Sequence, residues 1–282
     1  MGHMNTLALP QTADVPAICE PAVEAHYRDG RLESRAVTLA DEVPIAFEYN
    51  GISHAVMLAT PGDLEEFALG FSFCEGIVES PAEIYGVEVQ PSAQGITLAI
   101  ELASGAFARL KNRRRNLAGR TGCGICGCES LEQVLRPLPS RGVAGPRIRP
   151  AAVSAALGAL VGAQSLQKKT GAVHGAAWSA EHGSAEIVRE DVGRHNALDK
   201  LIGAMLREGV DARSGFAVVT SRASVEMVQK AACIGTILVA VSAPTVLATQ
   251  VAQDCGLTLV GFARGREFSV YSHAWRIALE SE

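Results

Sequence analysis

Short apolar segments alternate with helical segments over the second half of the chain, and this alternation constrains the fold more than any other feature of the sequence. The predicted helices cover 151–169, 194–207, 224–233 and 245–254, and the predicted strands cover 174–178, 185–189, 216–220, 237–241, 257–262 and 268–271. Strands that alternate with helices typically form a sheet with helices on both faces. The pattern therefore predicts a three-layer α/β domain over residues 151–282.

The first half of the chain predicts a smaller α+β domain over residues 36–136. Residues 36–60 alternate apolar and polar positions around Tyr49-Asn50-Gly51, which is typical of a β-hairpin. The segment Thr60-Pro61-Gly62-Asp63 predicts the start of a helix. Two further strands are expected, at 85–90 and 96–102.

Three segments are assigned no helix or strand. Residues 1–35 are interpreted as an expression-tag remnant and an N-terminal extension. A cysteine-containing loop over 113–130 ends the first domain. Residues 137–150 predict a linker between the domains, because proline recurs there and lacks the backbone donor that helices and sheets need.

The composition excludes several classes of protein. Hydrophobic residues make up 48% of the chain and charged residues 20%, which supplies a buried core and excludes a largely disordered chain. A formal net charge of −5 gives no reason to expect nucleic acid or an anionic membrane as a partner. The sequence holds no apolar run of bilayer-spanning length and no leader segment. We therefore expect a cytoplasmic protein that binds neither nucleic acid nor membrane.

Three of the seven cysteines crowd into the segment Cys123-Gly-Ile-Cys126-Gly-Cys128. The others lie among apolar neighbours and are interpreted as small core residues: Cys19, Cys74, Cys233 and Cys255. An odd number of cysteines with three in one cluster does not suit a secreted disulfide scaffold. The cluster therefore predicts a chemical role.

A Cys-x-x-Cys pair has three common uses. A structural zinc site needs about four ligands, and neither a second Cys-x-x-Cys nor a His-x-x-x-His follows, so that the fourth ligand would come from a distant residue or a second subunit. A thioredoxin-like redox pair normally begins a helix after a strand, whereas this pair lies among glycines. The third use is covalent sulfur transfer.

The surroundings of the pair favour sulfur transfer. A basic stretch that includes Arg109, Lys111 and Arg120 leads into the cluster, and neighbouring positive charge stabilises the reactive thiolate. Gly122, Gly124 and Gly127 give the loop the freedom to visit a donor and an acceptor. A charge run is more often a solvated surface, and the spacing alone leaves all three uses open.

Several blocks in the chain resemble one known family. They are Arg120–Gly127 around the cysteines, Glu190–Lys200, Ser221–Lys230, Val241–Thr245, Thr170–His174 and Thr60–Asp63 with Gly70-Phe71 and Glu75-Gly76-Ile77. Their order along nearly the whole chain resembles the FdhD family of formate dehydrogenase accessory sulfurtransferases.

The resemblance implies a specific role. Members take sulfur from a cysteine desulfurase as a persulfide and pass it to the bis-guanine-dinucleotide form of the molybdenum cofactor, which serves formate dehydrogenase. It implies that Cys123 bears the persulfide and that Cys126 is its partner. It also implies a homodimer and contact with the formate dehydrogenase catalytic subunit. Cys128 departs from the usual pair of the family.

The resemblance also implies a guanine-nucleotide site near the C-terminal strands. The corresponding segment is Phe262-Ala263-Arg264-Gly265-Arg266-Glu267. A glycine with two arginines after a strand suits phosphate binding, and it equally suits an ordinary surface turn.

The second domain of the family is similar to the cytidine-deaminase fold. Zinc deaminases use His-x-Glu followed later by Pro-Cys-x-x-Cys. Here Gly175 and Ala176 follow His174, and Thr245 follows Pro244, so zinc-dependent deamination is disfavoured and no metal is expected. We interpret His174 as a pocket residue, with a satisfied core histidine as the alternative.

Two turns are expected to line the cofactor pocket. Asp191 and Arg194 lie where a strand passes into a helix, and Ser221 and Arg222 lie at a second such junction. Ligands of α/β sheets usually bind at such junctions, where exposed helix amides favour an anion. The alternative for the first turn is helix capping with a surface salt bridge to Asp199 or Lys200.

Two other functions remain open on the sequence. One is a non-enzymatic chaperone that binds the molybdenum cofactor or guanine nucleotides and holds a structural zinc at the cysteine cluster. The other is a deaminase-like enzyme that works without the usual zinc ligands.

Overall fold

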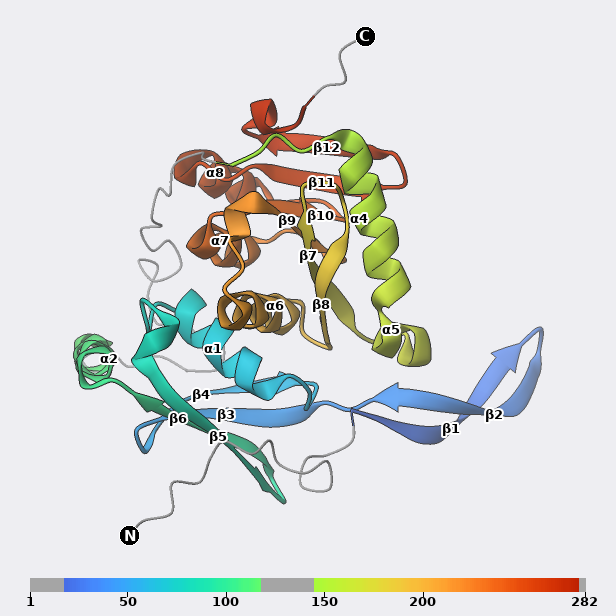
Figure 1. Ribbon diagram of the computed structural model, residues 1–282. Helices are drawn as coiled ribbons and strands as arrows, with labels where there is room; N and C mark the ends of the chain where they lie inside the picture. The colour runs from blue at the N-terminus through green and yellow to red at the C-terminus, as the bar shows by residue number, and fades with distance from the viewer. Residues whose placement is uncertain (1–17, 118–144, 279–282) are drawn as a thin grey trace.

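The computed structural model of the chain describes residues 18–117 and 145–278 (Figure 1). Cys123, Cys126 and Cys128 lie outside the described residues, as does most of the predicted linker at 137–150. Both domain boundaries therefore stay predictions. None of the helices described is long and apolar enough to cross a membrane.

A four-stranded sheet forms the N-terminal part, in the order β4-β3-β6-β5. Its strands are β3 (Val43–Tyr49), β4 (Ile52–Ala59), β5 (Ile84–Ser92) and β6 (Gly95–Leu102). The predicted hairpin is confirmed, because Asn50 and Gly51 both have positive φ and turn β3 into the antiparallel β4. Helix α1 (Leu64–Cys74) covers one face, where Phe67 and Phe71 pack on Phe47.

A six-stranded sheet forms the C-terminal part, in the order β12-β11-β10-β9-β7-β8. Its strands are β7 (His174–Ala180), β8 (Ala185–Asp191), β9 (Gly215–Val219), β10 (Ile237–Ala240), β11 (Leu259–Arg264) and β12 (Glu267–Ser272). β9, β10 and β11 run parallel, whereas β7 pairs antiparallel with β8 and β9, and β12 pairs antiparallel with β11.

Helices cover both faces of this sheet. α4 (Pro150–Ala163) packs on the face that carries Phe216 and Val218, and α6 (Arg194–Glu208), α7 (Val225–Ile234) and α8 (Val246–Cys255) pack on the opposite face. Every residue of β9 is buried, because helices cover both faces of the sheet. This explains why the sequence of β9 is continuously apolar. The predicted arrangement of a sheet with helices on both faces is confirmed.

The prediction of one helix over 151–169 is wrong in detail. The structure has α4 and then a short helix α5 (Ser165–Thr170), which Gln164 separates from it. Gln164 is buried with a non-helical ψ, so the chain changes direction there.

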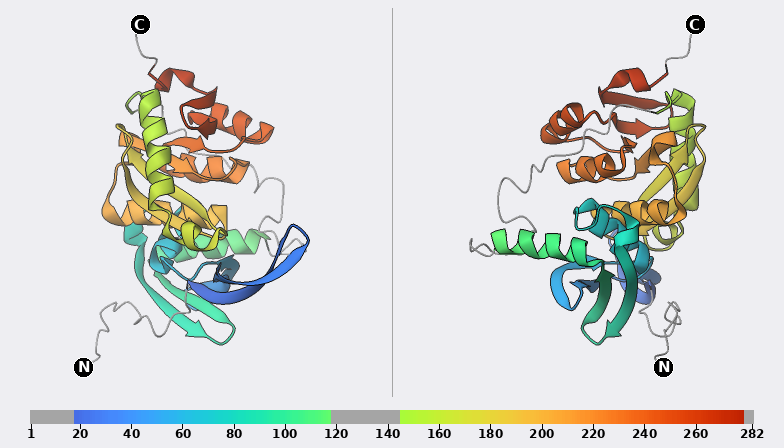
Figure 2. Two further views of the ribbon diagram at one scale, coloured as in Figure 1. Left: turned by 90° about the vertical axis from the view of Figure 1, so that its right-hand side faces the viewer. Right: turned by 60° about the vertical axis from the view of Figure 1, so that its left-hand side comes forward.

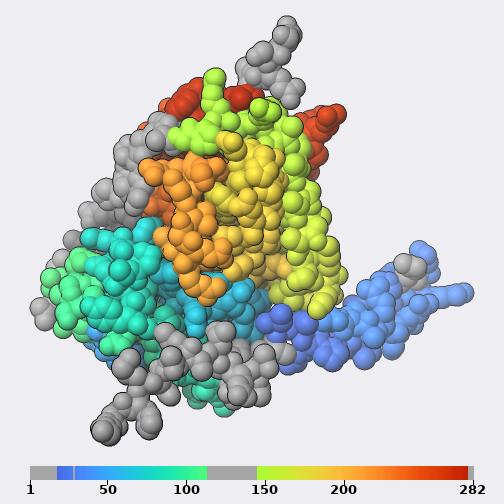
Figure 3. Space-filling model, in the orientation of Figure 1, coloured from blue at the N-terminus to red at the C-terminus, as the bar shows by residue number. Residues whose placement is uncertain are grey.

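Two elements are not among those predicted. Strands β1 (Cys19–Arg28) and β2 (Arg31–Ala40) form an antiparallel hairpin that extends from the body, and the described part of the basic stretch, with Arg109 and Lys111, lies in helix α2 (Ser104–Leu117) (Figures 1, 2 and 3). The remaining elements are the 3-10 turns η1 (Pro81–Glu83), η2 (Ala212–Ser214) and η3 (Ala274–Arg276).

Helices α1 and α6 join the two parts of the molecule by close backbone contact. A Cβ atom on Gly70 would overlap the backbone of Asp199, and a Cβ on Gly203 would overlap the carbonyl group of Glu66. Glycine at both positions lets the helix backbones touch, so that α1 packs on its own sheet and on α6 at once.

We expect Gly70→Ala to lower the free energy of unfolding by about 3 kcal/mol, because the clash involves backbone that cannot rotate away. Chemical denaturation of the purified chain measures this. Gly158→Ala in α4 is the matched control, because its Cβ meets no atom within 4 Å, and it should be neutral or stabilise by up to about 1 kcal/mol. Equal stabilities of the two variants would contradict the proposed role of Gly70.

Candidate functional site

Most of the predicted pocket residues that the structure describes lie at one edge of the six-stranded sheet, whereas the predicted catalytic residues Cys123 and Cys126 lie outside the described residues. β9, β10 and β11 end at this edge, and the antiparallel β7 begins there, since Ala176 pairs with Val219. Thr220 connects the end of β9 to the start of β7. Its backbone N–H donates to the Gly175 carbonyl at 3.0 Å, and its hydroxyl accepts from the Gly175 N–H at 2.9 Å. We call this edge the site edge.

Backbone hydrogen bonds link the turns along the site edge. The Ser242 N–H donates to the Ser221 carbonyl at 3.3 Å, and the Phe262 N–H donates to the Ser242 carbonyl at 3.2 Å. The Thr245 N–H donates to the Ala223 carbonyl at 3.1 Å. The turns after the three parallel strands therefore form one continuous surface.

The predicted residues on this surface differ in how far they are exposed to solvent. Arg222 and Phe262 are exposed, His174 and Arg194 are half-buried, and the Ser221 hydroxyl is buried and donates to the Arg222 carbonyl at 2.9 Å. The segment 262–267 is the end of β11 and the hairpin turn to β12, not a loop beyond a strand. Arg264 and Glu267 pair across this turn, Ala263 is buried, and Gly265 has positive φ.

Phe262 has an unusual backbone for its position. Its φ is 53° at an irregularity in the β11–β12 register, and 47% of the residue is exposed. A left-handed backbone in a large non-glycine residue is uncommon and is often found at functional sites. This leaves an aromatic ring half exposed just before the hairpin turn that carries Arg264 and Arg266.

The site edge is suited to an anion. Helices α6, α7 and α8 all begin there, and the free N–H groups of a helix N-terminus favour negative charge. Arg194, Arg222, Arg264 and Arg266 add positive charge along the same edge. Acidic side chains also lie along this edge, including Glu226 in the first turn of α7 and Glu267 in the hairpin.

His195 links two of these helix starts. Its Nε2 atom lies 3.1 Å from Glu226 Oε2 and 3.4 Å from the Ser224 hydroxyl. Burial and the nearby charge of Arg194 lower the pKa of His195 to about 4, although Glu226 acts in the opposite direction. The imidazole is therefore neutral near pH 7. Burial, and then Arg194, also lower the pKa of His174.

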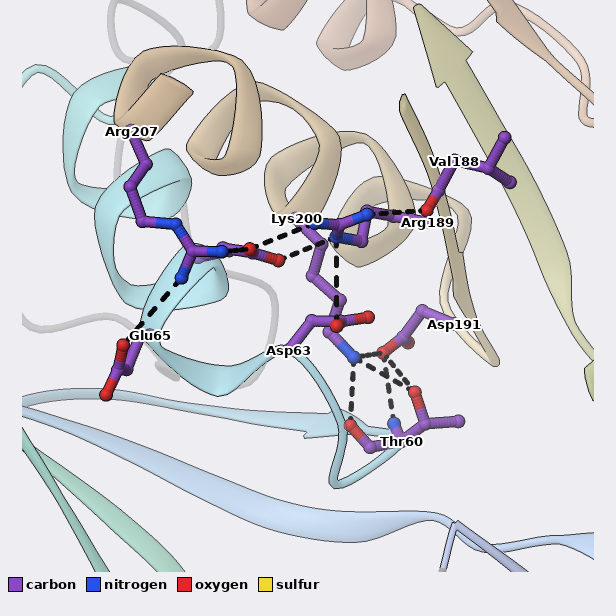
Figure 4. A network of polar contacts seen from close by, with 9 residues as sticks. Thr60, Asp63, Glu65, Val188, Arg189, Asp191, Lys200 and Arg207 are labelled. Carbon is purple, nitrogen blue, oxygen red and sulfur yellow. Dashed lines mark hydrogen bonds and ion pairs between the residues drawn. The ribbon is translucent and has the colours of Figure 1, made fainter. Parts of the chain in front are cut away.

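Asp191 does not face the site edge but is completely buried behind it (Figure 4). Its Oδ2 atom lies 2.6 Å from Lys200 Nζ and accepts from the Thr60 N–H at 3.0 Å and the Thr60 hydroxyl at 2.8 Å. Lys200, also fully buried, donates to the Thr60 carbonyl at 2.9 Å. The alternative of a salt bridge to Lys200 is therefore confirmed in its partner, but its placement on the surface is wrong, since the pair lies in the core.

Asp191 also holds the turn that leads to the site. Its Oδ1 atom accepts from the Gly193 N–H at 2.7 Å and from Asn196 Nδ2 at 3.0 Å. Asn196 in turn donates to the Leu58 carbonyl at 2.8 Å. The end of β4 thus positions the turn from which Arg194 and His195 project.

A second ionic network lies on the same junction (Figure 4). The buried Glu66 of α1 accepts two bonds from the guanidinium of Arg189, at 2.6 and 2.9 Å, and also pairs with Arg207 of α6. Bidentate pairs of this kind are geometrically specific. Together with the Asp191 network they fix α1 against β8 and α6.

A third buried pair lies between α6 and α7. Lys230 donates to both carboxylate oxygens of Asp199 at 2.8 Å and lies 3.4 Å from Glu75 at the end of α1. Burial alone would lower the pKa of Lys230, but Asp199 and Glu75 raise it above the ordinary value. The ammonium therefore stays charged in the core.

The four cysteines within the described residues differ in burial. Cys74 is fully buried, as expected of a core residue, and burial raises the pKa of its thiol well above the ordinary value. Cys19, Cys233 and Cys255 are half-buried. Within residues 18–117 and 145–278, no three His, Cys, Asp or Glu side chains are arranged to hold a metal ion.

Comparison with known proteins gives consistent matches along the chain. The sequence profile of the FdhD/NarQ family matches residues 40–278. The sulfur carrier protein FdhD of Variovorax paradoxus is 57% identical over 240 residues, which cover 85% of this chain and 86% of that protein. The protein of the same name from Bordetella petrii is 54% identical over 264 residues, covering 93% and 95%.

One solved structure supports the fold. It is the crystal structure of a protein described provisionally as a formate dehydrogenase accessory protein, from Desulfotalea psychrophila. The TM-score is 0.72 at 24% sequence identity, and the match covers 93% of this chain and 100% of that one.

We expect Lys200→Met to lower the free energy of unfolding by about 3–5 kcal/mol, because it leaves the Asp191 carboxylate buried without its cation. Lys169→Met, on the exposed side of α5, is the control and should change stability by less than about 0.5 kcal/mol. Adding Asp191→Asn to Lys200→Met should recover part of the loss in a double-mutant cycle. Equal stability of the two lysine variants would contradict a buried ion pair.

Proposed function

This chain belongs to the FdhD/NarQ family, and from that premise we propose that it is a sulfurtransferase that carries sulfur on Cys123. A cysteine desulfurase is the donor, and the bis-guanine-dinucleotide molybdenum cofactor is the acceptor. The sulfurated cofactor then serves a formate dehydrogenase catalytic subunit in the cytoplasm. The names of the relatives support the carrier role, and the basic stretch before Cys123 supports a reactive thiolate.

The first half-reaction is a thiol–persulfide exchange. The Cys123 thiolate attacks the terminal sulfur of the desulfurase persulfide. A new S–S bond forms on Cys123, the S–S bond of the donor breaks, and the donor cysteine leaves as a thiolate. The desulfurase has already supplied the redox chemistry, so this protein needs to provide only a thiolate and its positioning.

The second half-reaction needs two electrons, because the carried sulfur must leave as sulfide. The Cys126 thiolate can supply them by attacking the inner sulfur of the Cys123 persulfide. This forms a Cys123–Cys126 disulfide and releases hydrosulfide to the acceptor, after which a dithiol reductant restores both thiols. Cys126 therefore acts as the resolving thiol.

The acceptor binds at the site edge. The observation that carries this assignment is the meeting of three helix N-termini with Arg194, Arg222, Arg264 and Arg266. The cofactor carries two pyrophosphate groups, which such donors bind well. The exposed ring of Phe262 offers a surface on which a guanine base can stack.

The fold is proposed to be of the cytidine-deaminase type. The three-layer arrangement around the six-stranded sheet supports this relationship. The sequence lacks the Glu after His174 and the Cys after Pro244 that zinc-dependent deamination uses. We propose that the edge serves binding instead.

Incubation with an active cysteine desulfurase and cysteine should add one sulfur atom to the chain, and peptide mapping should place it on Cys123. Cys123→Ala should carry no adduct and should abolish activation of formate dehydrogenase. Cys255→Ala is the matched control and should keep both. An adduct that persists in Cys123→Ala would contradict the carrier role of Cys123. No adduct on any cysteine, with stoichiometric zinc in the protein, would favour the chaperone instead.

Arg222→Ala should weaken binding of GDP, used as a probe of the cofactor, by about tenfold or more, because a charge-assisted hydrogen bond contributes about 1.5–3 kcal/mol. Titration calorimetry measures the affinity. Arg213→Ala is the matched control, since this exposed arginine precedes β9 at the opposite edge of the sheet, and it should leave binding unchanged. Equal affinities of the two variants would exclude Arg222 from the site.

A further inference from the structure

Three side chains meet where helices α6 and α7 begin. They are His195 of α6 and Ser224 and Glu226 of α7, which we call the His195 cluster. Glu226 Oε2 lies 3.1 Å from His195 Nε2 and accepts from the Ser224 hydroxyl at 3.0 Å. The two helices lie side by side (Figure 1). The His195 cluster therefore connects two helix N-termini at the site edge.

The cluster affects which helix N-termini keep free N–H groups. Thr245 caps α8 in the ordinary way, because its hydroxyl accepts from the Ala248 N–H at 3.2 Å. Ser224 occupies the same position in α7, but its hydroxyl donates to Glu226 and caps no backbone N–H within the described residues. α6 begins after Gly193, which has no side chain to cap it. The N–H groups that can bind an anion are therefore concentrated at α6 and α7.

Glu226 places a negative charge beside these N–H groups. A carboxylate only accepts hydrogen bonds, so the proton of the contact lies on His195 Nε2. Burial and the nearby charge of Arg194 lower the pKa of His195 to about 4, so the imidazole is neutral near pH 7 and does not cancel the charge of Glu226. Lys230, one turn further along α7, is held by both carboxylate oxygens of Asp199 at 2.8 Å. The cluster therefore keeps a net negative charge in a fixed position.

A structural role alone does not require this arrangement. A glutamate in the first turn of a helix is favourable simply because its charge opposes the positive end of the helix dipole. That effect needs no partner for the carboxylate. Here a histidine from a second helix and the Ser224 hydroxyl both hold it, and the serine gives up its capping bond to do so. The arrangement indicates that the exact place of the charge matters.

Positive groups flank the cluster and can bind a phosphate. Arg222 is exposed, two residues before Ser224. The Nε atom of Arg194 is buried and has no hydrogen-bond partner among the described residues, which is uncommon for a buried donor. The Glu226 side chain is 57% exposed, so a ligand can approach it. A phosphate that binds these arginines is therefore also repelled by Glu226, and the repulsion grows with the charge of the phosphate.

Free nucleotides and dinucleotides differ in that charge. A terminal phosphate carries about −1.5 to −2 near pH 7, whereas a phosphate esterified within a chain carries a single negative charge. GDP and GTP end in a terminal phosphate, whereas the pyrophosphate of a dinucleotide is esterified at both ends. A fixed carboxylate therefore repels the free nucleotides more strongly than the dinucleotide.

We propose that Glu226, positioned by His195 and Ser224, makes the site edge select a guanine dinucleotide over free GDP and GTP. The inference rests on the proposed binding of the cofactor at this edge. Arginines and helix N–H groups attract all of these anions, and the guanine base is common to them. Discrimination therefore needs a group that disfavours the wrong ligand. Glu226 is that specificity-determining group, and His195 is a positioning residue.

Titration calorimetry of the full chain, with a metal chelator present, tests the proposal with GDP, GTP and the pyrophosphate diester of two guanosines. We expect the wild type to bind the diester more tightly than GTP. Glu226→Gln should raise the ratio of GTP affinity to diester affinity by about tenfold, because the terminal phosphate loses the larger repulsion. His195→Ala should raise the same ratio, and His195→Gln, which keeps a donor, should restore part of the discrimination.

Glu65→Gln is the matched control. Glu65 is also a glutamate in the first turn of a helix, but it lies beside Arg207 in the last turn of α6, at the opposite end of that helix from His195. The ratio of affinities should stay at the wild-type value in this variant. Thermal melting of both variants measures the structural contribution of each glutamate, which changes stability without changing the ratio.

Two results would overturn the role of Glu226. One is a ratio of affinities that Glu226→Gln leaves unchanged, and the other is an equal change in Glu65→Gln. Failure of the wild type to bind any of the three probes would instead overturn the assignment of the acceptor to this edge, and the present inference with it. Sulfur loading of Cys123 is measured separately, so none of these results bears on the carrier role.

Discussion

A lysine and an aspartate without any exposed surface can be retained in a core only if their charges and their remaining hydrogen bonds are satisfied. Asp191 and Lys200 meet this condition by sharing Thr60, which offers its N–H, its hydroxyl and its carbonyl to them. Thr60 stands between β4 and α1, while the charged pair stands on β8 and α6. One buried interaction therefore ties the four-stranded sheet and the six-stranded sheet together.

The close approach of α1 and α6 supports the same arrangement. With glycine at positions 70 and 203, the helix backbones come near enough for Glu66 to reach Arg189 and Arg207. The start of α6 is then held in place, and its amides join those of α7 and α8 along one edge. Each helix N-terminus is equivalent to about half a positive charge, so the placement of these helices adds to the charge of the arginine side chains at this edge.

Much of the fold could be predicted from the sequence, because it depends on local patterns. The continuous apolar run of β9 and the hairpin at Asn50-Gly51 follow from side-chain burial and turn chemistry. The hairpin of β1 and β2 was not predicted from the sequence, although Asp29-Gly30 between alternating segments is a hairpin signal. The break at Gln164 has no local signal, because α4 and α5 each continue a helical pattern.

The sequence indicated which residues belong to the candidate site, but it did not indicate which of them are exposed and which are buried. Arg222 and Phe262 were assigned to a binding surface and do lie at one edge of the sheet. Asp191 was assigned to the same surface and is buried instead, because its partner Thr60 lies 131 residues away in the sequence and no local pattern reveals it. Asp199-Lys200 between apolar residues on both sides was a signal for buried charge, since such a pair would interrupt an ordinary core helix.

The 131 residues that separate Thr60 from Asp191 affect how the site edge forms after synthesis. Contacts between distant segments form late, because a long loop must close before they contribute any stability. The turn that carries Arg194 and His195 is fixed by such a contact, so a partly folded chain has the residues of the site without their arrangement. The site edge is therefore complete only when the whole chain has folded, because its first turn depends on a contact that spans 131 residues.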